Sequence, residues 1–397
     1  MDNQIFNGER LKEALQFREK TMTMLAEETG IRKQSLSLYA NGGNVPPYEN
    51  VKKIADSLNF PVDFFMTKDL CTTITGNIYF RSQASATKKS RNAQKIKLEY
   101  VAKMYEVLLD YINFPEVNLP EDIDINLPED SFEADSETVL IEIEKLAAQV
   151  RAYWKLGDGP IENLQYVLES NGIIVTGFRD VNSAIDAFSQ QIKVNKKTVY
   201  IVALATGMKP IERLRFDMAH ELGHILMHSW EADNDCITRD EFNAREKQAN
   251  MFASAFLLPK DSFVRTVAAY PTNIDYYKFL KKKWKVSMQA MMYQARQLNV
   301  ISANQFQYMM RIVSKNGWRT KEPGDVPGQI GETIFQGAID LLFDGGYMTV
   351  DELLRDFASY GIILSQKDLE NFMCLRKGTL KQKEKIIPFM SVKKDNQ

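Results

Sequence analysis

The chain has 397 residues, of which 44% are hydrophobic and 26% are charged, and its formal net charge is -2. This length predicts two to four domains, and the near-neutral charge excludes a general attraction of the whole surface to nucleic acid. The sequence has no apolar run of the roughly 18 residues that a membrane span needs. An acidic, amphipathic N-terminus and three widely spaced cysteines predict a cytoplasmic protein with reduced thiols and no membrane partner.

The N-terminal segment has the pattern of short helices joined by tight turns. Ala26, Gly30 and Leu36 have helix-turn-helix spacing: a small residue where two helices cross, glycine in the turn and an apolar anchor on the next helix. Residues 1–68 are therefore predicted to form a five-helix domain. The domain is not basic, so protein binding is an alternative to DNA binding. The recognition helix would present five side chains to the major groove: Arg32, Lys33, Gln34, Ser35 and Ser37.

Residues 69–135 contain a basic stretch followed by an acidic one. Six cations and no acidic residue fall between positions 81 and 97, and a helix with an apolar stripe is predicted over 92–112. The acidic part lacks Lys and Arg and is interrupted by prolines, which predicts a linker or exposed loop over 113–135. A solvated linker is the simpler interpretation. The alternative is an acidic strip that docks on the basic stretch or mimics DNA.

Residues 136–300 alternate between helical and extended patterns. The strand over 198–203 is expected at a sheet edge, where an extended substrate would pair with it. Residues 301–397 are predicted to be helical, without a motif that assigns them a role. The fold class is therefore predicted to be mostly α with a small β-sheet (α+β). Within the central region, helices are predicted over 139–153, 161–170 and 210–227, and a further strand over 172–176.

All three histidines lie in one nine-residue stretch from His220 to His228. His220 and His224 are four residues apart, so on a helix they share one face and can bind one metal ion. This HExxH pattern predicts a Zn²⁺ hydrolase in which Glu221 is the general base. His228 lies about 12 Å along the same helix from His220, so a supporting role beside the ligands is predicted for it.

A catalytic zinc site needs a third protein ligand from elsewhere in the chain. Glu246 is the best candidate, and Asn250, one helical turn later, would orient a ligand. The fallback ligands are Glu241, Asp240 and Glu231. Because no further histidine exists to stabilise an oxyanion, that role is expected of a C-terminal residue or of Tyr200 or Arg245.

The motifs around His220, around Glu246 and at Leu257-Leu258-Pro259 resemble those of the ImmA/IrrE family of zinc metallopeptidases over residues 165–265. One position departs from the family, because the residue before the Ala-Asn pair, often acidic, is Gln248. The resemblance implies Glu221 as the catalytic base and three zinc ligands: His220, His224 and Glu246.

Residues 1–66 separately resemble the Cro/cI-like (XRE) helix-turn-helix, which many members of this family carry on the same chain. The best-understood members cleave a partner repressor. The resemblance implies a zinc-dependent regulatory endopeptidase whose partners are a cognate regulator protein and double-stranded operator DNA. The alternative is a DNA-binding transcriptional regulator or antitoxin-like protein whose zinc domain is sensory or structural. A homodimer is left open.

Overall fold

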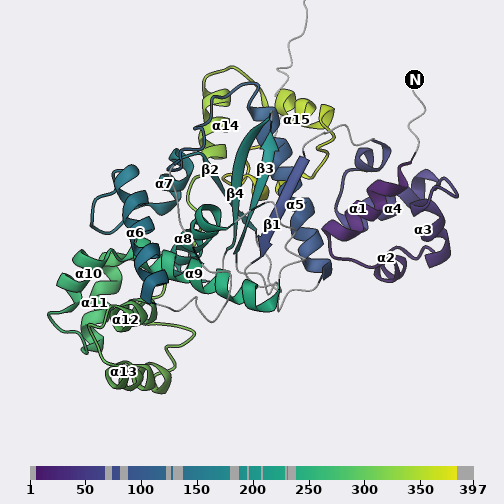
Figure 1. Ribbon diagram of the computed structural model, residues 1–397. Coiled ribbons are helices and arrows are strands. Elements are labelled where there is room, and N and C mark those ends of the chain that lie inside the picture. Colours follow the sequence, from purple (N-terminus) through teal and green to yellow (C-terminus); the bar gives the residue numbers. More distant parts are fainter. Residues whose placement is uncertain are drawn as a thin grey trace, which may run out of the picture.

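The computed structural model describes residues 6–67, 74–80, 88–121, 127, 137–178, 187–194, 196–206, 209–228, 230 and 238–381. In this part of the chain, helices surround one four-stranded sheet (Figure 1). The expected mostly α fold with a small sheet is therefore confirmed. Across the described ranges, no helix combines the length and the apolar character that crossing a membrane requires.

The N-terminal domain is a bundle of four α-helices and a closing 3-10 helix, as predicted. Thr21 caps the start of the second helix through its hydroxyl, and Gly30 ends that helix with φ at 71°. This left-handed conformation suits glycine and lets the chain turn tightly into the recognition helix. The elements are α1 (Gly8–Phe17), α2 (Met22–Thr29), α3 (Lys33–Ala40), α4 (Tyr48–Leu58) and η1 (Val62–Met66).

The sheet has the strand order β1-β3-β4-β2. β3 pairs antiparallel with both β1 and β4, whereas β2 pairs in parallel with β4. β4 therefore lies inside the sheet, and the expectation that residues 198–203 form an edge for a substrate strand is wrong. The backbone hydrogen bonds on both sides of β4 are already made to the neighbouring strands β2 and β3. The strands are β1 (Ile74–Phe80), β2 (Ile173–Phe178), β3 (Ala187–Val194) and β4 (Lys197–Ala205).

Both faces of the sheet are buried, but by different helices. Because successive side chains of a strand point to opposite faces, Ile174 and Ile201 join one core while Val175 and Val202 join the other. The first core includes α5 (Lys88–Leu108), α14 (Ile334–Asp344), α15 (Val350–Ser359) and α16 (Gln366–Phe372). The second core includes α6 (Glu137–Tyr153), α7 (Leu164–Ser170), α8 (Ile211–Met227), α9 (Arg239–Leu257), α10 (Lys260–Val267), α11 (Ile274–Trp284), α12 (Met288–Gln297) and α13 (Ala303–Lys315).

The segment 69–135 contributes β1 to the sheet and α5 to the first core. Of its acidic part, the structure describes residues 113–121 and 127. There Glu116 forms an ion pair at 2.5 Å with Lys197 at the start of β4. This exposed ion pair places part of the acidic segment beside the sheet.

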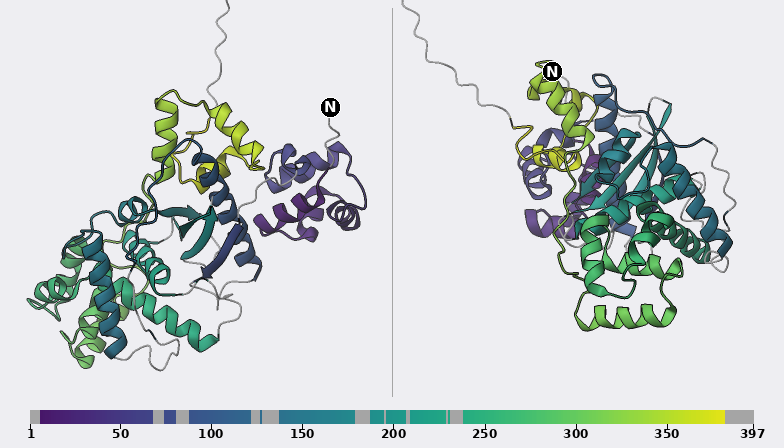
Figure 2. Two further views of the ribbon diagram at one scale, coloured as in Figure 1. Left: turned by 45° about the horizontal axis from the view of Figure 1, so that its top comes forward. Right: turned by 90° about the vertical axis from the view of Figure 1, so that its left-hand side faces the viewer.

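The helix-turn-helix domain is joined to the C-terminal helices through α1. The guanidinium of Arg18, at the end of α1, contacts both carboxylate oxygens of Asp368 on α16, at 3.1 and 2.5 Å. Beside this pair, the rings of Phe17 and Phe372 pack edge to face with centroids 5.6 Å apart. Residues about 350 positions apart thus share one core. Figure 1 shows α3 on the side of the domain away from the sheet, and the two views of Figure 2 show the whole domain beside α5.

Candidate metal centre

The helix α8 carries the HExxH pattern on its buried side. Pro210 is its N-cap, where a missing N–H leaves no helix hydrogen bond unmade. Gly223 faces α9, and a Cβ at this position would approach the ring of Phe252 to 3.1 Å, so glycine lets the two helices pack closely. The polar side chains of the pattern are at most 2% exposed: His220, Glu221 and His224.

The helix α9 brings Glu246 to the two histidines. The Nε2 atoms of His220 and His224 are 3.0 Å apart, and the carboxylate oxygens of Glu246 lie 3.5 and 3.2 Å from them. Ligand atoms about 2.0–2.2 Å from a tetrahedral Zn²⁺ are roughly 3.4 Å from one another. Two imidazoles and a carboxylate are also a donor set of catalytic zinc sites, in which a fourth position stays open. The three side chains therefore fit the predicted metal, and among the described residues they are the one cluster of this kind.

The other ring nitrogens of the two histidines are held by neighbours. Nδ1 of His220 lies 3.1 Å from Oδ1 of Asn250, which accepts its proton and leaves Nε2 with a lone pair. Nδ1 of His224 lies 2.8 Å from Nδ1 of His228. Nε2 of His228 lies in turn 3.1 Å from Oε1 of Gln248. When His228 donates to Gln248, its Nδ1 accepts from His224, and Nε2 of His224 is also left with a lone pair.

Burial and charge set the protonation of this group. Burial raises the pKa of the Glu246 carboxyl, but the hydrogen bonds and charges that His220 and His224 provide when their rings are protonated outweigh it and hold the pKa well below its usual range. Burial lowers the pKa of His228 well below its usual range, and the charge of His224 adds to this. A metal site of this kind needs an ionised carboxylate at Glu246 and a neutral ring at His228.

Glu221 is oriented by the sheet. Its Oε2 accepts a hydrogen bond of 2.6 Å from the hydroxyl of Ser189 on β3, and neither side chain is exposed. The sequence does not predict this partner, because β3 itself is not predicted. Ser189 and Gln190 are buried polar residues that break the apolar pattern of the strand. A short polar pair between apolar residues was the only local signal.

The other sequence candidates that the structure describes lie outside the cluster. Glu241 forms an ion pair of 2.5 Å with Arg245 one turn later, and Asp240 is exposed. Glu231 lies outside the described residues. The hydroxyl of Tyr200 accepts a hydrogen bond from β3. Of the three candidate carboxylates that the structure describes, Glu246 is thus the one that meets the histidines.

The predicted DNA-contacting residues lie at the N-cap of α3 and in its N-terminal part. Leu36 and Tyr39 of the same helix are buried in the domain core. Of the five predicted side chains, Arg32, Lys33 and Gln34 are exposed, whereas Ser35 and Ser37 are half-buried.

Comparison with protein families identifies two regions of the chain. Residues 171–296 match the IrrE N-terminal-like domain, and residues 8–69 match a helix-turn-helix domain. The chain thus joins a helix-turn-helix domain to an IrrE N-terminal-like peptidase domain. The resemblance to ImmA/IrrE metallopeptidases with an XRE-type helix-turn-helix is confirmed. The IrrE-like region begins just before β2 and includes every residue of the metal cluster. No curated protein matches the chain.

Proposed function

We propose that this chain is a zinc-dependent regulatory endopeptidase that cleaves a cognate regulator protein in the cytoplasm. The observation that carries the proposal is the meeting of His220, His224 and Glu246 inside an IrrE-like domain. The helix-turn-helix domain adds operator DNA as a second partner.

The chemistry follows from the donor set and from Glu221. Zinc held by the three side chains would lower the pKa of a water molecule to about 7 and polarise a peptide carbonyl. Glu221, next to the first ligand, takes the proton of the attacking water and passes it to the leaving amine. Ser189 supports this role, because its hydroxyl holds one carboxylate oxygen in a fixed orientation.

The side chains that contact the two histidines orient their rings for metal binding. Asn250 orients the ring of His220, and the chain from Gln248 through His228 orients the ring of His224. Both Nε2 atoms therefore converge on one point together with the carboxylate of Glu246. Removing hydrogen-bonding partners of this kind typically lowers metal affinity or activity 10- to 100-fold.

The proposed operator contacts use the outward side of α3. Arg32, Lys33 and Gln34 are exposed there, and Ser35 and Ser37 flank them. The ion pair of Arg18 with Asp368 packs this domain against the C-terminal helix α16.

Cleavage of a regulator tests the proposal. Zinc-loaded protein is incubated with the regulator that is encoded beside it, and the products are identified by mass spectrometry. We expect a defined cut that a chelator abolishes and that Glu221→Gln abolishes, because the amide cannot accept a proton. The matched control is Glu9→Gln, at an exposed position of α1, which is expected to cut like wild type. An intact regulator, with zinc and operator DNA both bound, would favour the transcriptional regulator with a sensory zinc domain.

A further inference from the structure

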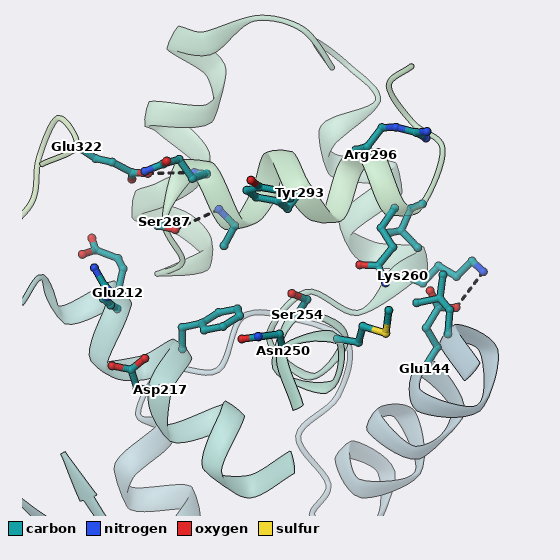
Figure 3. Close-up of a pocket in the computed structure, with 18 of the residues that line it drawn as sticks. Glu144, Glu212, Asp217, Asn250, Ser254, Lys260, Ser287, Tyr293, Arg296 and Glu322 are labelled. Carbon is teal, nitrogen blue, oxygen red and sulfur yellow. Dashed lines mark hydrogen bonds and ion pairs between the residues drawn. The ribbon is translucent and has the colours of Figure 1, made fainter. Parts of the chain in front are cut away.

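A cavity of about 1270 Å³ lies between α6, α8, α9 and α12 (Figure 3). Small-molecule sites typically measure about 300–1,000 Å³. The size of this cavity therefore suits a segment of polypeptide better than one small ligand. Its wall contains the apolar side chains Phe216, Met251 and Tyr293 together with several carboxylates, a mixture that suits a chain with both apolar and charged side chains.

The cavity begins one helical turn from the metal ligands. On α8, the lining residue Phe216 precedes His220 by four residues, and on α9, the lining residue Asn250 follows Glu246 by four. Four residues of helix span about 6 Å. An extended peptide advances about 3.3 Å per residue. A polypeptide whose scissile carbonyl lies at the metal would therefore reach the cavity within about two residues.

At one end of the cavity, three carboxylates surround one buried amine. The buried amine of Lys281 is shared by the carboxylates of Glu212, Glu322 and Asp325. Glu322 also accepts hydrogen bonds from two backbone N–H groups at the start of α12, at 2.8 and 3.0 Å. Glu212 is the least paired of the three. It lies 3.9 Å from the amine, and its Oε2 is buried without a hydrogen-bond partner in the described structure.

Within the described residues, Glu212 has one ion pair, with Lys281, although Arg213 and Arg319 also line the cavity. Arg215 is close enough for its charge to interact with Glu212. Its guanidinium, however, donates its hydrogen bonds to main-chain oxygens of Ile161, Glu162 and Lys285. Glu212 is only 9% exposed, and burial raises the pKa of its carboxyl. The other cations that Figure 3 labels, Lys260 and Arg296, lie at the opposite end of the cavity. An ammonium or guanidinium group that entered beside Glu212 would make a charge-assisted hydrogen bond.

We propose that this cavity binds the polypeptide substrate on one side of the scissile bond, and that Glu212 binds a lysine or arginine side chain of that segment. The inference rests on the proposed peptidase function. It assigns the substrate a basic residue within a few positions of the cut.

Peptide hydroxamates test this inference by binding rather than by cleavage. Zinc-loaded full-length protein is titrated calorimetrically with acetohydroxamate, which reaches the metal alone, and with hydroxamates that carry a tripeptide on either side. The tripeptides contain lysine, norleucine or glutamate. We expect the lysine probe to bind about tenfold more tightly than the norleucine probe in one of the two directions, and the glutamate probe to bind most weakly.

Variants separate the cavity from the metal. Glu212→Gln is expected to remove the preference for lysine. Ser254→Trp, which fills the cavity from α9, should weaken every extended probe about tenfold. The matched control is Ser170→Trp, at the exposed end of α7, which should bind all probes like wild type. The zinc content of each variant shows that its metal centre is folded.

Two failures are distinguishable. Extended probes that bind no more tightly than acetohydroxamate, or a lysine preference that survives Glu212→Gln, would overturn the inference and leave the peptidase proposal in place. A protein that binds neither zinc nor acetohydroxamate would overturn both.

Discussion

Nδ1 of His224 lies 2.8 Å from Nδ1 of His228, so the third histidine of the chain contacts a ligand of the candidate site and lies outside the ligand cluster itself. The helix ends at His228, whose backbone is extended with φ at -114° and ψ at 139°. Its ring nevertheless returns to His224, and Gln248 holds the other side of the ring. The predicted support of the metal site by His228 thus has a geometric basis.

Removing the ring of His228 should weaken zinc binding. His228→Ala leaves Nδ1 of His224 without its acceptor, and we expect the zinc dissociation constant to rise about 10- to 100-fold. Competition with a chromophoric chelator measures this constant. Gln248→Glu keeps an acceptor for His228 and is the matched control, with an affinity at least equal to that of wild type. Equal zinc affinity in His228→Ala and wild type would contradict the supporting role.

Local signals account for the parts of the site that the sequence predicts. The spacing of His220 and His224 places both on one helix face wherever that helix lies. Gly30 marks the helix-turn-helix turn because few other residues adopt its conformation. Glu246 follows from a motif and from a helical stripe, and α9 brings it to the histidines.

Long-range pairing accounts for what the sequence misses. β3 contains two buried polar residues, Ser189 and Gln190, so the sequence of this segment lacks the apolar pattern of a buried strand. Ser189, the hydrogen-bond partner of Glu221, is therefore not predicted either. The place of β4 inside the sheet depends on the order in which distant strands pair. The contact of Arg18 with Asp368 joins helices about 350 residues apart, and no local sequence pattern predicts such a contact.

The ion pair of Arg18 with Asp368 should stabilise the docking of the helix-turn-helix domain. The side chains are 21% and 11% exposed, and the contact is bidentate. A double-mutant cycle with alanine, followed by urea unfolding, is expected to give a coupling energy of about 1–2 kcal/mol. The exposed pair Lys12 and Glu9 is the comparison and should give less than about 0.5 kcal/mol. Equal coupling in the two pairs would argue against a docking role.

Glu169 should make the stability of the fold depend on pH. The carboxyl is 7% exposed at the junction of α7 with α14, accepts from the N–H of Ile334 at 3.0 Å, and burial raises its pKa to about 7. Its ordinary pKa is 4.5, so between these values the folded chain holds a proton that the unfolded chain releases. The free energy of unfolding should therefore fall by about 3 kcal/mol as the pH rises from about 4.5 through 7.

Glu169→Gln tests this dependence, because the amide stays neutral at every pH. Urea unfolding at pH 5 and pH 8 should show that the variant lacks most of the decrease that wild type shows. The exposed substitution Glu9→Gln should keep the decrease. A decrease of the same size in Glu169→Gln and wild type would assign the effect to other groups.

Operator binding should depend on the exposed side of α3. Gln34→Ala is expected to weaken binding by about 1–3 kcal/mol and to relax specificity at one base pair, because an amide can pair with adenine. Fluorescence anisotropy with an operator selected from random DNA measures both effects. The control is Lys52→Ala, at an exposed position of α4, outside the recognition helix. Unchanged affinity and specificity in Gln34→Ala would point to a protein partner for this domain.

Zinc stoichiometry tests the central claim most directly. Wild type and Glu221→Gln are purified, dialysed against zinc and measured by atomic emission, together with Glu246→Ala. We expect one zinc in both wild type and Glu221→Gln, because Glu221 is the proposed base and not a proposed ligand. We expect a large loss in Glu246→Ala, which lacks the proposed third ligand. No zinc in wild type, or one zinc held as tightly in Glu246→Ala as in wild type, would contradict the metal centre formed by His220, His224 and Glu246.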